Sequence, residues 1–296
     1  MKIAAFPKCY LDAISHDRSM TVFDWITMAA ALPVDGLEMY EGFFTSLEPD
    51  YLDSVSDAIA SANFEMPMLC CSPDFTAPSE ADRQKAIDFQ IQMVEATKRL
   101  GGRFCRVLTG QRYPEVTVEQ GVEYAKACIE AVLPIAKELD IVLSLENHYK
   151  DGHWKYPEFA QKKEVFLKVL EAIPEREYFG VQYDPSNAIV AGDDPIELLR
   201  DVVDRVVTMH ASDRYLADGT TLEELRQADG TLGYSPNLKH GVTGQGLNDY
   251  DQIFTILSEA GYDGWVSIED GMNGMDEMRD SAIFLGQMRD KYFSGS

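Results

Sequence analysis

Four short apolar segments in the second half of the chain each end in a residue that can bind a hard metal ion. The segments are VLSLENH, GVQYDPSN, VVTMHASD and GWVSIED, and the residues are Glu146, Asp184, His210 and Glu269. Three carboxylates and one imidazole suit Mn²⁺ or Mg²⁺ better than a cation that prefers thiolates. A lone carboxylate at a strand end is more often a helix cap, and Asp184 before Pro185 has that alternative. Because ligand-type residues recur at four successive strand ends, we predict one divalent metal site.

A cation in this site would have coordination positions left for a substrate. A sugar or hydroxy-ketone could fill them through its carbonyl and the neighbouring hydroxyl, and the adjacent C–H bond would become more acidic. A nearby carboxylate can remove that proton and leave a metal-stabilised enediolate, which the same or a second group reprotonates elsewhere. We expect Glu146 and Glu269 to serve both as metal ligands and as catalytic bases.

Two further residues are candidates for a role beside the predicted ligands. His148 lies two residues after Glu146 and therefore points to the same side of the strand. It is either a general base or a hydrogen-bond donor to a substrate hydroxyl. Arg106 lies inside a predicted strand, where a buried arginine usually needs a carboxylate partner. It forms either an inner ion pair, with Glu38 as the candidate partner, or a contact with the substrate.

Four more residues are candidate substrate contacts, each with a structural alternative. Asn187 contacts the substrate or stabilises a turn, and Asp213 contacts the substrate or orients His210. His240 lies in a long predicted loop, where it folds over the substrate or faces the solvent. Trp154 lies in another loop, where it stacks on a sugar or packs the loop itself.

Strand and helix patterns alternate along the whole chain. Short apolar segments rich in Val, Ile, Leu and Met predict strands buried on both faces at residues 2–7, 36–40, 65–72, 104–109, 142–147, 180–184, 206–211 and 264–269. Amphipathic segments predict helices at residues 21–32, 50–62, 79–100, 117–139, 162–173, 195–203, 248–260 and 275–292. This alternation predicts an α/β fold, namely a single (β/α)₈ TIM barrel over residues 1–296. A doubly wound open sheet is the alternative.

Two long segments interrupt this alternation. Residues 148–161 follow the fifth predicted strand and are aromatic and basic, and residues 212–247 follow the seventh. Segments this long between barrel elements usually cover or wall an active site. We therefore expect extended loops after strands 5 and 7.

Composition narrows the classes of partner. The net charge of −24 disfavours nucleic acid, because an acidic surface repels phosphate backbones. Five cysteines without a CxxC pair indicate reduced thiols, and no segment approaches the length of a membrane span. The first residues resemble a strand rather than a signal peptide, so we expect a cytoplasmic protein that does not bind membranes.

At these motifs the chain resembles the xylose isomerase-like TIM barrel superfamily, in the sugar isomerase and epimerase branch. That branch includes ketose 3-epimerases, inosose dehydratases and hydroxypyruvate isomerases. The resemblance covers essentially the whole chain and rests on LSLENH, QYDPSN, TMHASD and the segment from GVTGQG to SIED. It implies that the four ligands bind one divalent ion, with Mn²⁺ favoured and Mg²⁺, Co²⁺ or Zn²⁺ as alternatives. It also implies that Glu146 and Glu269 exchange the substrate proton.

The chain departs from the ketose 3-epimerases at several positions. Asn187 stands where they have a histidine, the segment after His210 is longer, and His148 with its aromatic loop is additional. The ENH motif with an extended loop also resembles the catalytic subunit of lyases that cleave 3-oxo-C-glycosides. In that alternative His148 would remove the proton, and the aglycone would leave by β-elimination.

The sequence therefore predicts a divalent-metal-dependent sugar isomerase or epimerase, with the lyase as the first alternative. A non-catalytic sugar-binding barrel is an alternative of another class. A three-zinc endonuclease of the same superfamily is disfavoured, because the chain has five histidines and an acidic surface. The expected partner is a small sugar or keto-sugar. By analogy we also expect a homo-oligomer, or a partner subunit if the protein is a C-glycoside lyase.

Overall fold

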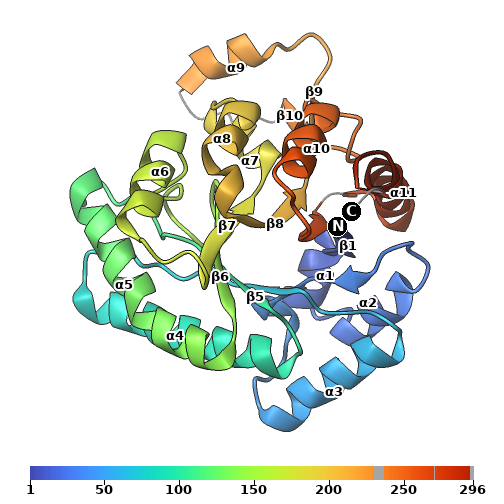
Figure 1. Ribbon diagram of the computed structural model, residues 1–296, viewed down its shortest axis with the longest axis horizontal. Coiled ribbons are helices and arrows are strands. Elements are labelled where there is room, and N and C mark those ends of the chain that lie inside the picture. Colours follow the sequence, from blue (N-terminus) through green and yellow to red (C-terminus); the bar gives the residue numbers. More distant parts are fainter. Residues whose placement is uncertain (230–236, 270, 294–296) are drawn as a thin grey trace.

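The computed structural model describes residues 1–229, 237–269 and 271–293, and it has a central ring of strands surrounded by helices (Figure 1). Neighbouring strands of the ring are parallel and follow the order β2-β1-β11-β8-β7-β6-β5-β4-β3. Their bounds are β1 (Lys2–Ala5), β2 (Gly36–Leu37), β3 (Met39–Tyr40), β4 (Met68–Cys70), β5 (Phe104–Val107), β6 (Val142–Glu146), β7 (Phe179–Tyr183), β8 (Val206–Ala211) and β11 (Trp265–Ile268). Each of them overlaps one of the eight predicted segments.

The second predicted strand is divided in two at Glu38. β2 pairs with β1 and β3 pairs with β4, so the two halves together continue the ring between these neighbours. Nine strands thus occupy the eight positions of a barrel, and the prediction of a (β/α)₈ fold is confirmed. The side chain of Glu38 is 1% exposed, so the interruption places a carboxylate in the protein interior.

Helices form the outer layer of the barrel (Figure 1). Eight of them correspond to the predicted helices: α2 (Val22–Ala29), α3 (Pro49–Ser61), α4 (Glu80–Arg99), α5 (Val118–Leu139), α6 (Lys163–Ala172), α8 (Pro195–Val202), α10 (Tyr250–Glu259) and α11 (Met275–Tyr292). A capping box between Thr117 and Gln120 begins α5. Two short helices, α1 (Leu11–Ser15) and α7 (Pro185–Ala191), are not among the predicted helices, although Asp184 before Pro185 indicated a cap at the start of α7.

The apolar core lies between the strands and the inner faces of the helices. Trp25, Phe166 and Phe254 are fully buried there. All five cysteines are free thiols, and four of them are buried, as the sequence predicts. In the described part of the chain, no helix has the length and apolar character needed to cross a bilayer.

The two predicted extended loops are present after β6 and β8. The first folds back on the loop after β5, because Phe159 N donates to Gly110 O. The second contains α9 (Leu222–Asp229) and an antiparallel ribbon of β9 (Arg214–Leu216) and β10 (Leu238–His240). Leu225 and Leu238 form a small apolar cluster with Ile189 and Val190 of α7, which joins this segment to the barrel.

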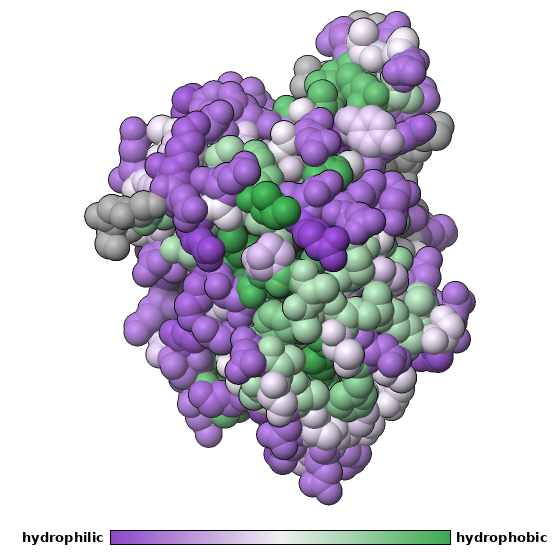
Figure 2. Space-filling model, turned by 90° about the vertical axis from the view of Figure 1, so that its right-hand side faces the viewer, coloured by the Kyte–Doolittle hydropathy of each residue, from purple (hydrophilic) through white to green (hydrophobic). Residues whose placement is uncertain are grey.

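Figure 2 shows the segment around α9 projecting from the top of the molecule, above a face on which hydrophilic residues border a broad hydrophobic area. Residues 230–236, within the second loop, lie outside the described part of the chain. The prediction that the whole of 212–247 covers the site therefore stays a prediction.

Candidate active site

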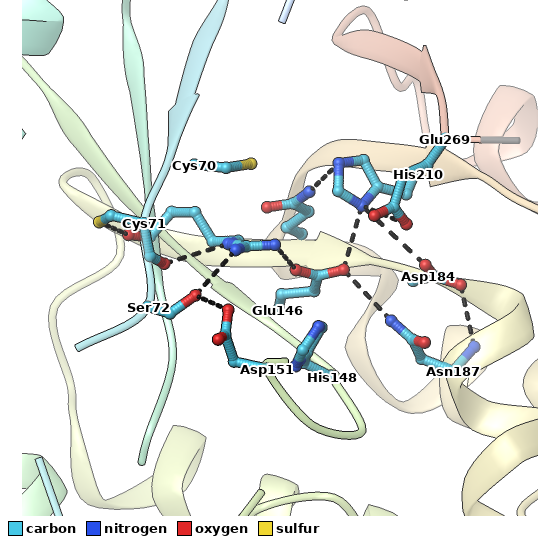
Figure 3. Close-up of polar contacts among 12 residues, drawn as sticks. Cys70, Cys71, Ser72, Glu146, His148, Asp151, Asp184, Asn187, His210 and Glu269 are labelled. Atoms are coloured by element: carbon cyan, nitrogen blue, oxygen red, sulfur yellow. Dashed lines mark hydrogen bonds and ion pairs between the residues drawn. The ribbon is translucent and has the colours of Figure 1, made fainter. Parts of the chain in front are cut away.

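The four predicted metal ligands meet at one end of the barrel (Figure 3). Glu146 ends β6, Asp184 directly follows β7, His210 lies in β8 and Glu269 directly follows β11. Their candidate ligand atoms all lie within 4.8 Å of one another, and all four side chains are buried. His210 Nδ1 is 3.0 Å from Glu146 Oε1, 3.4 Å from Glu269 Oε2 and 3.9 Å from Asp184 Oδ2. Parallel strands that end on one face have brought these side chains together.

Asp184 uses its two carboxylate oxygens differently. Oδ1 accepts a hydrogen bond from Asn187 N, so Asp184 is the N-cap of α7. The same oxygen also accepts a hydrogen bond from Ser212 Oγ. Oδ2 is buried, has no hydrogen-bond partner among the described residues and faces the cluster. The helix cap and the ligand, which the sequence offered as alternatives for Asp184, therefore coexist in the geometry.

Burial and the charges of Glu269 and Glu146 raise the pKa of Asp184 to about 7. Three buried carboxylates thus share a small volume, and at least one of their oxygens accepts no hydrogen bond from the described residues. A hard divalent cation would satisfy that oxygen and neutralise the mutual repulsion. The donor set fits Mn²⁺, Mg²⁺ or Zn²⁺.

Glu38 orients the imidazole of His210. Its Oε1 lies 2.7 Å from His210 Nε2, and Gln182 Nε2 lies 2.6 Å from the same nitrogen. This contact leaves Nδ1 directed at the carboxylates of the cluster. A carboxylate that holds the second nitrogen of a metal-binding histidine commonly fixes its tautomer. The suggestion that Asp213 orients His210 is therefore wrong.

Arg106 pairs with Glu146, so the prediction of Glu38 as its partner is also wrong. Its Nη1 lies 2.9 Å from Glu146 Oε2, and Nη2 donates to Ser72 Oγ. Burial alone would raise the pKa of Glu146, but His210 and Arg106 outweigh it and lower that pKa to about 2. Arg106 also lines the cavity beside the cluster, so a substrate contact stays a prediction for it.

A cavity of about 200 Å³ opens beside the cluster. Its wall includes the predicted ligand Glu269 and two other predicted site residues, Arg106 and His148. Lys8, just after β1, also lines it and donates from Nζ to Glu269 Oε1 at 2.8 Å. Sequence reasoning missed Lys8, although a lysine directly after a predicted strand was a usable signal.

His148 has a buried carboxylate partner that the sequence did not indicate. Its Nδ1 lies 3.2 Å from Glu158 Oε2, within ion-pair distance. Glu158 is fully buried, and its Oε1 accepts from Thr109 N and Thr109 Oγ1. Burial opposes the charged form of His148, but Glu158 and Glu146 outweigh it and raise the pKa of the imidazole. The resulting pair is a histidine in the cavity wall, backed by an anchored carboxylate.

The other predicted contacts take different positions. Asn187 donates from Nδ2 to Glu146 Oε1 at 3.2 Å, so it contacts a ligand. Trp154 is buried in its loop and is not part of the cavity wall, whereas Tyr149 of the same loop is. His240 is half-buried on β10 and is also not part of that wall. Their roles toward a substrate stay predictions.

Asp213 organises the loop that follows β10. It is fully buried, and its carboxylate accepts hydrogen bonds from the backbone N–H groups of Arg214, Gly244, Gly246 and Asn248. These four hydrogen bonds explain why the charged carboxylate of Asp213 is buried. A contact between Asp213 and the substrate stays a prediction.

Replacing Asp213 by Asn should therefore destabilise the protein. The new amide would direct N–H groups at N–H groups, at a cost on the order of 2 kcal/mol in the free energy of unfolding. Urea denaturation should reveal the loss, with the exposed Asp218→Asn in the same loop as control. Equal stability of the two variants would contradict this account of Asp213.

Fold and site together define a TIM-barrel protein with three carboxylates and one histidine clustered at the C-terminal ends of its strands. The chain belongs to the xylose isomerase-like TIM barrel family, whose model matches residues 26–288. The resemblance predicted from the sequence is thereby confirmed.

Known relatives are distant. Inosose dehydratase of Clostridium tetani is 25% identical over 159 residues, which cover 53% of this chain and 49% of that protein. 3-Oxo-isoapionate decarboxylase of Pectobacterium atrosepticum is 27% identical over 194 residues, which cover 61% of this chain and 62% of that protein. The chain thus matches about half to three fifths of the length of these relatives. The crystal structure of the IOLI protein with a binding zinc atom has a TM-score of 0.74 at 17% identity, and the match covers 99% of this chain and 100% of that one.

Proposed function

We propose that this protein is a divalent-metal-dependent enzyme that removes a proton next to the carbonyl group of a small sugar or keto-sugar. The observation that carries this proposal is Asp184 Oδ2, which is buried in a cluster with Glu146, His210 and Glu269 and has no hydrogen-bond partner among the residues that the structure describes. Further support comes from the zinc atom in the related IOLI structure and from the two curated relatives, whose names denote oxo compounds.

Glu146, Asp184, His210 and Glu269 would hold the metal ion, with Mn²⁺ favoured. When bound, the ion would supply Lewis-acid polarisation of the carbonyl. Arg106 and Lys8 keep Glu146 and Glu269 ionised, since each cation contacts one of these carboxylates. Glu38 keeps His210 Nδ1 turned toward the cluster.

The fate of the proton separates the candidate reactions. If Glu146 or Glu269 removes the proton and a carboxylate returns it to the same or the neighbouring carbon, the reaction is an epimerisation or an isomerisation. If a group on the β-carbon leaves with the bonding electrons, the reaction is an elimination. His148 in the cavity wall, paired with the buried Glu158, favours this second candidate, because it is a base separate from the metal ligands.

Hydrogen exchange with solvent tests the shared first step. Mn²⁺-loaded protein is incubated in heavy water with ketoses, inososes and 3-oxo-glycosides, and the compounds are then analysed by mass spectrometry. We expect at least one compound to gain deuterium at the carbon next to its carbonyl, and we expect EDTA to stop the exchange until Mn²⁺ is restored. Elemental analysis of protein purified without chelator should find about one divalent ion per chain. Sugar binding that needs no metal and causes no exchange would instead indicate a non-catalytic sugar-binding barrel.

A further inference from the structure

Arg214 is a buried arginine that forms no ion pair with a carboxylate of the described residues. Its side chain is 5% exposed, and its buried Nε has no hydrogen-bond partner in the part of the chain that the structure describes. The nearest carboxylate along the chain, Asp213, is already engaged by backbone N–H groups. Arginine keeps its charge at every physiological pH, and buried arginines are almost always paired. A buried guanidinium with an unused N–H donor is therefore suited to bind an anion.

Arg214 lies next to the candidate active site. Its Cζ is 5.7 Å from the ring centre of Tyr149, which lines the cavity beside Glu269. On the β9–β10 ribbon Arg214 is the cross-strand partner of His240. Burial and the charges of Arg214 and Lys8 lower the pKa of His240 to about 3, so these three basic groups are electrostatic neighbours.

The cavity wall does not share the acidic excess of the whole chain. The whole sequence has 50 acidic residues and 26 lysines and arginines. Counted in the same way, the wall has three cations, Lys8, Arg106 and Lys150, against the two carboxylates Asp151 and Glu269, and it also contains His16, His148 and His153. A wall of this composition is more favourable to an anion than the rest of the surface.

We propose that Arg214 and Lys8 bind an anionic group of the substrate, either a carboxylate or a phosphate. The substrate would then be an acidic sugar derivative rather than a neutral ketose. This assignment rests on the proposed function in one respect, because the anionic group and the reacting carbonyl would belong to the same molecule. The guanidinium is well suited to the task, since its planar array of N–H donors matches the oxygens of both anions.

Simple anions test the site without any knowledge of the substrate. Mg²⁺-loaded protein is titrated with inorganic phosphate and, separately, with acetate at constant ionic strength in a calorimeter. We expect saturable binding of at least one anion, weakened by about tenfold or more in Arg214→Met and by less in Arg214→Lys. Binding of the anion to the metal is common to the wild type and the two Arg214 variants, so the difference among these three proteins reports on Arg214. Lys8→Met, which leaves Arg214 in place, should also weaken binding.

The control is Arg176→Met, because Arg176 is exposed, pairs with Asp204 and precedes β7 at the other end of the barrel. Circular dichroism establishes that each variant is folded. If neither anion binds the wild type, or if Arg214→Met and Lys8→Met both bind as well as Arg176→Met, the proposal is overturned. Two matched pairs, D-glucose with D-glucuronate and D-fructose with D-fructose 6-phosphate, then distinguish a carboxylate from a phosphate.

The exchange experiment in heavy water separates this proposal from the proposed function. Anion binding through Arg214 without any exchange of substrate hydrogen would support the anion site and contradict the proposed enzymatic function. Exchange of neutral ketoses as readily as of sugar acids would support the proposed function and contradict the anion site.

Discussion

Replacing Glu269 by Gln is expected to lower turnover by on the order of a thousandfold, because the carboxylate serves the site in two ways. As an anion it is one of three carboxylates that would hold the cation, and as a base it is placed to exchange a substrate proton. The amide keeps the size of the side chain but loses both properties. It also leaves Lys8, now 2.8 Å from Glu269 Oε1, without its counter-charge. The fold should persist, since Glu269 lies at a strand end rather than in the apolar core.

Two measurements on this variant separate the two tasks. Deuterium exchange, with whichever compound the wild type labels, reports the chemistry, and elemental analysis reports the metal content. Glu65→Gln is a matched control, because Glu65 is an exposed partner of Lys2 remote from the cluster. Exchange and metal content equal to the wild type would remove Glu269 from the site. Loss of exchange with full metal content would assign it the role of base rather than essential ligand.

The sequence was sufficient to predict the positions of the four ligands. Each of Glu146, Asp184, His210 and Glu269 stands at or beside the end of a buried strand, and parallel barrel strands present their C-terminal ends on one face. The apolar pattern of a strand involves only neighbouring residues, so it can be recognised in a single sequence. The same logic placed the helices, whose caps and apolar faces are also local.

The partners of these ligands could not be predicted, because they depend on which side chains meet across the barrel. Glu38 and His210 are 172 residues apart, and no local pattern links them. Arg106 could have reached either Glu38 or Glu146, and only the register and tilt of the strands select Glu146. The sequence indicated Glu38 only as a candidate partner of Arg106. It also gave no sign that the strand is interrupted at Glu38, which belongs to neither β2 nor β3.

The long loops were the least predictable part of the site. Their lengths indicated walls around the cavity, but irregular backbone has no periodicity from which contacts can be inferred. Glu158, for instance, is placed by hydrogen bonds from Thr109 in a different loop. Trp154 and Tyr149 were both candidates for stacking on a sugar or for packing the loop, and of these two only Tyr149 lines the cavity.

Whether His148 is a base is decided by its removal. If it takes the substrate proton, His148→Ala should reduce deuterium uptake by at least about a hundredfold, whereas uptake should persist if Glu146 and Glu269 act alone. The matched control is His153→Ala, because His153 lines the same cavity from the same loop and its ring contacts His16 instead. Imidazole added to His148→Ala should restore part of the uptake, which a merely structural role of His148 would not allow.

Glu158 should behave as a positioning residue in the same experiment. Glu158→Gln keeps an acceptor for Thr109 but removes the charge 3.2 Å from His148 Nδ1, so uptake should fall by about tenfold while His148 stays in place. In the His148→Ala background the Glu158→Gln change should have no further effect, because a residue that acts only through the imidazole has nothing left to orient. Independent, multiplicative losses in the double variant would show that Glu158 serves the site by another route, and full uptake in His148→Ala would return the proton transfer to the two glutamates.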